Sequence, residues 1–200
     1  NAVLEGLKRL LSDNKVRPTD IKGILHATTV ATNAVIERKG ANTALITTDG
    51  FRDVLIIGRQ KRYETYDLHT NKPAPLVPRR HILEVLERID SEGNIIVPID
   101  RNSIDIAINS ALELGAQSIA ISLIHAYANP SHEREVSEKL TKANSKIFIS
   151  CSSDVSPKYR EYERTNTTVL NAYIGPIVEN YLGELKIALE TNNIEPKIFV

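Results

Sequence analysis

The chain has 200 residues and a mass of 22.3 kDa, with 42% hydrophobic and 25% charged residues. This composition is typical of a globular protein and excludes a disordered tail, a fibre and a small disulfide-stapled fold. Lys and Arg together number 25, as do Asp and Glu, so the formal net charge is zero and no overall positive field favours nucleic acid or an anionic membrane. With one cysteine, Cys151, and no apolar run near the roughly 20 residues of a membrane span, we expect a cytoplasmic protein without nucleic-acid or membrane partners.

The first 60 residues alternate between helical and extended patterns. Apolar residues at helical spacing begin the chain, and Pro18 interrupts them before a short apolar stretch. The patterns predict, in order, a helix over 2–11, a strand over 21–25, a helix over 30–39 ended by Gly40, a strand over 43–47 and a short helix over 51–57.

The middle of the chain combines a long polar loop with a predicted hairpin. Pro73, Pro75 and Pro78 remove backbone donors from residues 58–80, which favours an irregular loop. Apolar runs over 82–89 and 95–99 flank a Gly- and Asn-containing turn, and they predict an antiparallel hairpin.

The remaining residues alternate regularly between helix and strand, which favours an α/β fold. The predicted elements are a helix over 103–114 capped by Gly115, a strand over 118–123, a helix over 131–143, a strand over 146–150, a long helix over 165–191 and a strand from 197. Pro176 within the long helix predicts a kink or a break. Because the chain begins without Met and ends in a predicted strand, we expect it to be part of a longer protein.

Three segments can carry chemistry. His26–Ala34 lies where a predicted strand turns into a helix, so it offers either an anion site or an ordinary helix cap. The second segment, 50–62, contains four cations that either grip a carboxylate or phosphate or hold the loop: Arg52, Arg59, Lys61 and Arg62. The third segment, 156–168, alternates Arg and Glu, which fits a solvated ion-paired helix face unless these side chains enter a cleft.

Other motifs favour structural roles. His125 and His132 fit no standard zinc spacing and are interpreted as ordinary histidines, and Cys151 as a small buried residue. The sequence contains neither a Gly-x-Gly-x-x-Gly fingerprint nor a phosphate-binding P-loop.

Several runs together resemble the A subunits of the hydantoinase/oxoprolinase family. They are 26–34 with 37–40, then 44–53 with 57–60, 72–79, 122–130 with 132–133, and 155–165 running on to 169–173. The resemblance covers about residues 15 to 183, in order and with family-like spacing.

This resemblance implies an ATP-dependent enzyme related to N-methylhydantoinase, 5-oxoprolinase or an acetone carboxylase subunit. The implied chemistry is phosphorylation of a ring amide oxygen, which makes the cyclic amide cleavable by water, with a B subunit as partner. The implied fold is part of an actin/Hsp70/sugar-kinase-like (ribonuclease H-like) ATPase domain with an inserted α/β region. Its expected division is a partial actin-like domain over 1–80, an insert over 81–150, and a return to the core over 151–200.

The resemblance also suggests site residues. Those expected to be catalytic are His26, Thr28, Thr29, Arg52, Asp53 and Arg59. Those expected to bind substrate are Thr32, Asn33, Arg62, Arg160, Glu163 and Arg164, and no metal ligand is expected within the chain.

The chain also departs from the family pattern. Ala27 stands where members usually carry glycine, so its Cβ excludes a positive φ or a very close ligand approach. The two phosphate loops of the family are absent, so we expect ATP and Mg²⁺ to bind through segments outside this chain and the 200 residues alone to be inactive. The alternatives are an acetone-carboxylase-type subunit that phosphorylates a ketone, and a non-catalytic assembly module.

Overall fold

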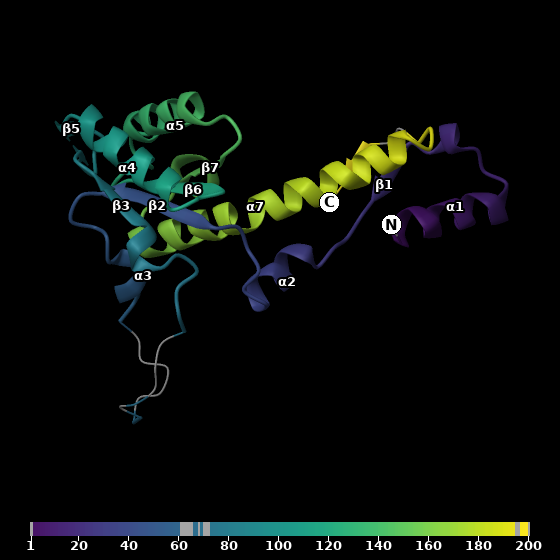
Figure 1. The fold of residues 1–200 in the computed structure, drawn as a ribbon, viewed down its shortest axis with the longest axis horizontal. Helices are drawn as coiled ribbons and strands as arrows, with labels where there is room; N and C mark the ends of the chain where they lie inside the picture. Colours follow the sequence, from purple (N-terminus) through teal and green to yellow (C-terminus); the bar gives the residue numbers. More distant parts are fainter. Residues whose placement is uncertain (1, 61–65, 68, 70–72, 195–196, 200) are drawn as a thin grey trace. The chain divides into compact units, whose positions relative to one another are not determined.

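The computed structural model describes residues 2–60, 66–67, 69, 73–194 and 197–199, which form two compact units. One unit comprises Asn1–Lys39 with Ile177–Val200, and the other Gly40–Pro176. Both mix helices with parallel strands (Figure 1), so the expected α/β class is confirmed. The expected division into 1–80, 81–150 and 151–200 stays a prediction.

The unit containing the N-terminus is built around one strand pair. Its elements are α1 (Ala2–Asn14), η1 (Pro18–Asp20), β1 (Gly23–Leu25), α2 (Val30–Ile36), the second half of α7 (Glu161–Glu190) and β8 (Lys197–Phe199). Strand β1 pairs in parallel with β8, with Ile24 opposite Ile198. Buried Leu11, Leu185 and Leu189 form the centre of this unit's core.

The larger unit contains a four-stranded parallel sheet in the order β3-β2-β6-β7. The strands are β2 (Thr43–Thr48), β3 (Ile82–Val85), β6 (Ser118–Ser122) and β7 (Phe148–Cys151). The helices are α3 (Val54–Ile57), η2 (Arg79–His81), α4 (Arg101–Glu113), α5 (Ser131–Ala143), α6 (Ser152–Val155) and the first half of α7, and a small ribbon joins β4 (Arg88–Ile89) to β5 (Ile95–Val97).

Alternate residues of the strands build a core on each face of this sheet. Ala44 and Ile46 of β2 join the cluster formed with α4 and α5, whereas Leu45 joins Val169 and Ala172 of α7. Burial on both faces explains why β2 and β6 read as continuous apolar or small-residue runs rather than alternating ones. The first half of α7 therefore packs against the face opposite α4 and α5.

Helix α7 continues through Pro176, so of the predicted kink or break the break is wrong, and the kink stays a prediction. A proline inside a helix removes one hydrogen bond and costs about 3 kcal/mol. The turn before it is held from outside, because Ala172 and Tyr173 are buried and the Ala41 N–H donates to the Tyr173 carbonyl at 2.9 Å. Tertiary packing thus outweighs the local penalty.

The predicted hairpin is confirmed only in its second half. Strand β3 pairs in parallel with β2, and the antiparallel pairing is limited to β4 and β5. The chain leaves the sheet at Leu86 and Glu87, so the apolar run over 82–89 is two strands rather than one. The turn itself forms as expected, because the Asp90 carboxylate accepts hydrogen bonds from Asn94 and Glu92.

Gly40 does not cap the preceding helix, contrary to the prediction. Helix α2 ends at Ile36, and Arg38 takes the left-handed conformation at φ 56°, with Lys39 N–H donating to the Ala34 carbonyl at 2.9 Å. A Cβ on Gly40 would lie 2.0 Å from the Tyr173 ring. Glycine is therefore required at position 40 by packing.

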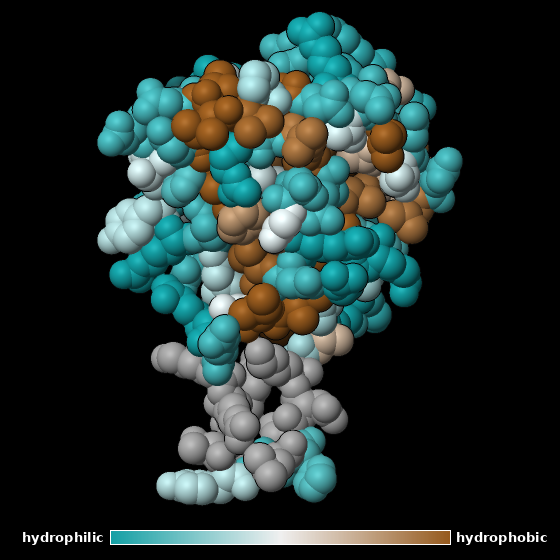
Figure 2. Space-filling view, turned by 90° about the vertical axis from the view of Figure 1, so that its left-hand side faces the viewer, coloured by the Kyte–Doolittle hydropathy of each residue, from teal (hydrophilic) through white to brown (hydrophobic). Residues whose placement is uncertain are grey.

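The surface of the larger unit is mixed in polarity. Figure 2 shows brown apolar residues among hydrophilic ones, and Leu86, Ile96 and Ile106 of this unit are at least half exposed. Within the described part of the chain, no helix combines the length and the apolar character that crossing a bilayer requires.

Two glycines of α7 provide a matched test of this packing. A Cβ on Gly175 would lie 2.3 Å from the Phe148 ring, whereas a Cβ on Gly183 would meet nothing within 4 Å. We expect Gly175→Ala to lower the free energy of unfolding by about 1–3 kcal/mol through overpacking. Gly183→Ala should raise it by about 0.5–1 kcal/mol through helix propensity. Urea unfolding followed by circular dichroism measures both, and equal effects of the two changes would contradict the packing described here.

Candidate functional site

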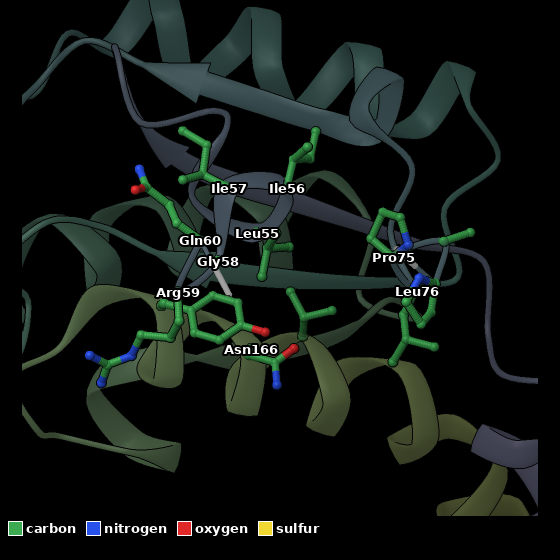
Figure 3. A pocket seen from close by; sticks show the side chains of 13 residues that line it. Leu55, Ile56, Ile57, Gly58, Arg59, Gln60, Pro75, Leu76 and Asn166 are labelled. Atoms are coloured by element: carbon green, nitrogen blue, oxygen red, sulfur yellow. The ribbon is translucent and has the colours of Figure 1, made fainter. Parts of the chain in front are cut away.

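An open pocket of about 610 Å³ lies in the larger unit, between α3, residues 73–76 and the first turns of α7 (Figure 3). This volume falls within the range of small-molecule sites. The pocket is lined by Leu55, Ile56, Ile57, Gly58, Arg59, Gln60, Pro73, Ala74, Pro75, Leu76, Tyr162, Asn166 and Val169. Its walls are mainly apolar, with a few polar side chains among them.

Helix α7 forms one wall of the pocket. Tyr162, Asn166 and Val169 follow each other at the i, i+4, i+7 spacing that places side chains on one face of a helix. Figure 3 shows Asn166 on α7 facing Leu55, with Pro75 and Leu76 toward one end and Arg59 and Gln60 toward the other. The amide of Asn166 therefore lies near the middle of an otherwise apolar wall.

Gly58 and Gln60 shape the opposite wall. Gly58 ends α3 with φ 56° and ψ −137°, a conformation that side chains with a Cβ rarely adopt. Gln60 also has a positive φ, of 54°. A turn that needs unusual backbone angles beside a pocket is typical of a functional loop.

Arg59 and Glu163, both predicted site residues, form an ion pair at the pocket. The Nε and Nη2 atoms of Arg59 each lie 2.5 Å from Oε1 of Glu163. Partial desolvation raises the pKa of Glu163, but the Arg59 hydrogen bond and the Arg59 and Arg160 charges outweigh it, and the pKa is lowered overall. The carboxylate is therefore ionised at neutral pH.

Arg52 and Asp53 hold the start of α3 rather than point into the pocket lining. The Asp53 carboxylate accepts two hydrogen bonds from Arg79, at 2.7 and 3.1 Å, and Arg52 donates to the Arg79 carbonyl at 3.3 Å. The Arg79 hydrogen bond lowers the pKa of Asp53. These contacts agree with the interpretation that Arg52 and Asp53 hold the loop, and the catalytic role of the two residues stays a prediction.

Arg164 is buried at the carboxyl edge of the sheet. Its Nη2 donates to the Leu123 carbonyl at 2.7 Å and contacts the Glu161 carboxylate, and its guanidinium lies 5.4 Å from the centre of the Tyr127 ring. Its Nε and Nη1 atoms are buried and have no acceptor among the described residues. Arg160, in contrast, is exposed, with φ 83° and its guanidinium over Tyr159.

The predicted residues of the first segment lie in the other compact unit. His26 stacks on Tyr181, with Nε2 2.8 Å from the hydroxyl oxygen, and the Val30 N–H donates to Thr28 Oγ1 at 3.3 Å. The Asn33 side chain donates to Thr29 Oγ1 at 3.4 Å. Thr29 occupies the N-cap position of α2 without accepting a capping hydrogen bond on its side chain.

The remaining residues singled out in the sequence are Thr32, Arg62 and Ala27. Thr32 is exposed on α2, and Arg62 lies outside the described residues. Ala27 does not have a positive φ, in agreement with the constraint that its Cβ imposes. The structure thus brings Arg59 and Glu163 together and Arg52 and Asp53 together, and places His26 through Asn33 in a separate unit.

A buried polar network at the carboxyl ends of the strands was missed by sequence reasoning. The Glu87 carboxylate accepts a hydrogen bond from Thr48 and lies 2.8 Å from His132 Nδ1, and all three side chains are buried. Thr48 Oγ1 in turn accepts from the Ile124 N–H at 2.9 Å. The sequence signal was weak, because Glu87 is one of three charged residues in the run over 82–89, together with Glu84 and Arg88. His132 is thus a paired core residue, as the sequence interpretation expects.

Glu133 joins the same region through its own contacts. Its carboxylate accepts from the Leu123 N–H, the Ser152 hydroxyl and the Ser153 N–H, at 2.9, 2.6 and 2.9 Å. Burial raises the pKa of Glu133, although these hydrogen bonds oppose the rise. Glu133 therefore ties α5 to the ends of β6 and β7.

The helix starts of the larger unit are unfavourable for phosphate. Carboxylates occupy the helix starts of the larger unit: Asp100 caps α4, Glu133 lies in the first turn of α5, and Glu161 and Glu163 lie in the first turn of α7. Negative side chains at these positions repel phosphate from the helix ends that would otherwise attract it. No cluster of three metal-ligating side chains occurs within the described ranges.

Comparison with known proteins identifies relatives of the chain. Residues 1–143 match the hydantoinase/oxoprolinase N-terminal region. The acetophenone carboxylase gamma subunit of Aromatoleum aromaticum is 36% identical over 80% of this chain and 24% of its own length. The 5-oxoprolinase 1 of Arabidopsis thaliana is 33% identical over 92% of this chain and 16% of its own length.

A solved structure agrees with these sequence relatives. The crystal structure of ATP-dependent caprolactamase from Pseudomonas jessenii superimposes with a TM-score of 0.87 and 32% identity, over 98% of this chain and 29% of that protein. The chain therefore spans less than a third of each relative described here.

Removal of Glu87 tests the buried network. We expect Glu87→Ala to lower the free energy of unfolding by about 3 kcal/mol, because it leaves buried His132 and Thr48 without their partner. Glu92→Ala, at an exposed position of the β4–β5 turn, should change it by less than about 0.5 kcal/mol. Denaturant titration distinguishes the two, and a Glu87→Ala protein as stable as the parent would exclude a structural role for the network.

Cys151 gives a second test through pH. Burial, together with the charges of Glu133 and Asp154, raises the pKa of the thiol from 9.0 to about 12. Because the folded state holds this proton more tightly than the unfolded state, stability from Cys151 is present below pH 9 and is lost as the pH rises toward 12. We expect the stability difference between parent and Cys151→Ala to shrink over this interval, and iodoacetamide at pH 8 to label the thiol only after unfolding. Rapid labelling of the folded protein would contradict the burial.

Proposed function

Because the chain belongs to the hydantoinase/oxoprolinase family, we propose that it is the N-terminal region of an ATP-dependent enzyme that opens a cyclic amide at a C–N bond. The observation that carries this proposal is the likeness to ATP-dependent caprolactamase over 98% of the chain. The 5-oxoprolinase relative adds a second enzyme named for a cyclic amide. We assign the activity to a longer protein, because the chain spans less than a third of each relative.

In this proposal the pocket between α3 and α7 holds the ring of the substrate. Leu55, Leu76 and Val169 offer apolar contacts for ring methylenes. The side chains of Asn166 and Tyr162 offer hydrogen-bond donors and acceptors for the amide N–H and C=O. An apolar cavity with two or three convergent polar groups suits a small cyclic amide better than a highly charged ligand.

The cofactor belongs to other parts of the enzyme in this proposal. The helix starts of the larger unit bear carboxylates, which disfavour phosphate at these positions. We assign ATP and Mg²⁺ to segments outside the chain, as the family resemblance implies. The actin-like ATPase fold, the B-subunit partner and the catalytic roles of His26, Thr28 and Thr29 form part of the same proposal. The relatives named as subunits support a multi-subunit assembly.

A second candidate function is supported by the acetophenone carboxylase relative. A ketone presents the same acceptor oxygen as an amide but lacks the N–H. The pocket offers donors for that oxygen in either case, so the fold alone does not separate the two reactions. The substrate that stimulates ATP hydrolysis distinguishes the two reactions directly.

The test measures phosphate release by the natural full-length protein with its partner subunit. We expect ε-caprolactam, hydantoin or 2-pyrrolidinone to stimulate ATP hydrolysis, and acetone or acetophenone with bicarbonate to leave it at the background rate. Stimulation by the ketones alone would replace the first function with the second.

Two neighbouring positions of α7 test the pocket itself. Asn166 lines the pocket, whereas exposed Thr167 does not. Asn166→Phe should fill the space and raise KM for the active cyclic amide by about tenfold or more, and Thr167→Phe should leave KM within about twofold of the parent. Equal KM values for the two variants would move the substrate site elsewhere.

A further inference from the structure

The pocket between α3 and α7 contains a single charged side chain among the described residues that line it. That side chain is Arg59, at the end of the pocket away from Pro75 and Leu76 (Figure 3). Two of its nitrogen atoms lie 2.5 Å from the same oxygen of Glu163. The positive charge that faces the pocket is therefore accompanied by a negative charge in direct contact.

This pairing weakens the attraction that Arg59 exerts on an anion. A carboxylate in the pocket is drawn toward the guanidinium and repelled by Glu163, and the two effects oppose each other at distances larger than the separation of the pair. The carboxylate also loses hydration against the apolar walls. Arg160 acts on the Glu163 charge but does not line the pocket, and its guanidinium lies over Tyr159.

An uncharged ring experiences neither penalty. Its methylenes gain apolar contact with Leu55, Leu76 and Val169, while its amide exchanges hydrogen bonds with water for hydrogen bonds with Asn166 or Tyr162. The difference between the two ligand types on which the ion pair acts is their charge.

We infer that this pocket selects uncharged cyclic amides over cyclic amides that carry a carboxylate, and that the Arg59–Glu163 ion pair sets this selectivity. The inference rests on the proposed function in taking the pocket as the substrate site. The inference specifies the charge of the substrate, which the names of the relatives do not determine.

Two commercial lactams, compared in the parent protein and in charge variants of the ion pair, test the effect of this charge. 2-Pyrrolidinone and 5-oxoproline share one five-membered ring, and the second differs by a carboxylate that is ionised at pH 7.5. Binding of each to the natural full-length protein, without ATP, is measured by isothermal titration calorimetry and by ligand-observed NMR. Phosphate release with each lactam is measured in parallel.

The parent protein should bind 2-pyrrolidinone at least about tenfold more tightly than 5-oxoproline. Glu163→Gln keeps a side chain of similar size but removes the negative charge that pairs with Arg59. The preference for 2-pyrrolidinone, given as the ratio of the two dissociation constants, should therefore decrease by about fivefold. Arg59→Gln removes the ion-pair partner of the Glu163 carboxylate, so the preference for 2-pyrrolidinone over 5-oxoproline should increase. Glu138→Gln, on the exposed face of α5, serves as the matched control and should leave the ratio unchanged.

The possible outcomes separate the two proposals. Equal or tighter binding of 5-oxoproline by the parent protein, no binding of either lactam, or a ratio that Glu163→Gln and Arg59→Gln leave unchanged would each overturn the inference. Failure of every cyclic amide to stimulate phosphate release would contradict the proposed function alone, because the binding ratio is measured without turnover. Thermal unfolding of each variant checks that it is folded, and the opposite signs expected for the two charge changes guard against a general loss of binding.

Discussion

The close packing of α7 against the parallel sheet sets the position of the pocket residues that this helix carries, Tyr162, Asn166 and Val169. Val169 and Ala172 meet Leu45 and Ala120 of the sheet, and Gly175 lets the Phe148 ring approach the helix backbone. These small contacts fix the rotation of α7 about its own axis. The same rotation turns Tyr162 and Asn166 toward α3, so the core and the pocket share one helix face. A change that rotates or lifts the helix would therefore alter stability and ligand binding together.

Charges in this unit are mostly satisfied within the chain. Arg79 binds the Asp53 carboxylate, Arg59 binds Glu163, and Glu87 lies between Thr48 and His132. Arginines that are close in sequence can suggest a grip for an anionic ligand, but a guanidinium already paired with a carboxylate is a weaker anion site. Arg164 differs, because two of its nitrogen atoms, Nε and Nη1, are buried without an acceptor among the described residues, as is Nε of Arg52. It retains donors for an additional acceptor.

The sequence predicts elements well where periodicity is strong and local. The helix over 103–114 with Gly115 after it appears as α4 followed by a glycine at φ 67°, and the helix over 131–143 appears as α5 with the same bounds. Long-range pairing is different. The run over 82–89 divides because β3 joins β2, which is 34 or more residues earlier in the chain, and no local pattern reports that partner. Pro176 in α7 and Gly40 show the same limit, since tertiary contacts with Ala41 and Tyr173 decide their roles.

The candidate site was predictable in composition but not in geometry. Arg59 and Glu163 are 104 residues apart, and only the fold shows that each neutralises the other. The distinction matters because relatives that are about one third identical to this chain over the aligned residues carry the names of chemically different enzymes. A fold conserved at that level can keep its sheet and helices while one substitution at position 59 or 163 changes the charge that a ligand meets. The charge that a ligand meets at this end of the pocket is therefore set by this pair of side chains, and the scaffold beneath it supplies the position at which the pair acts.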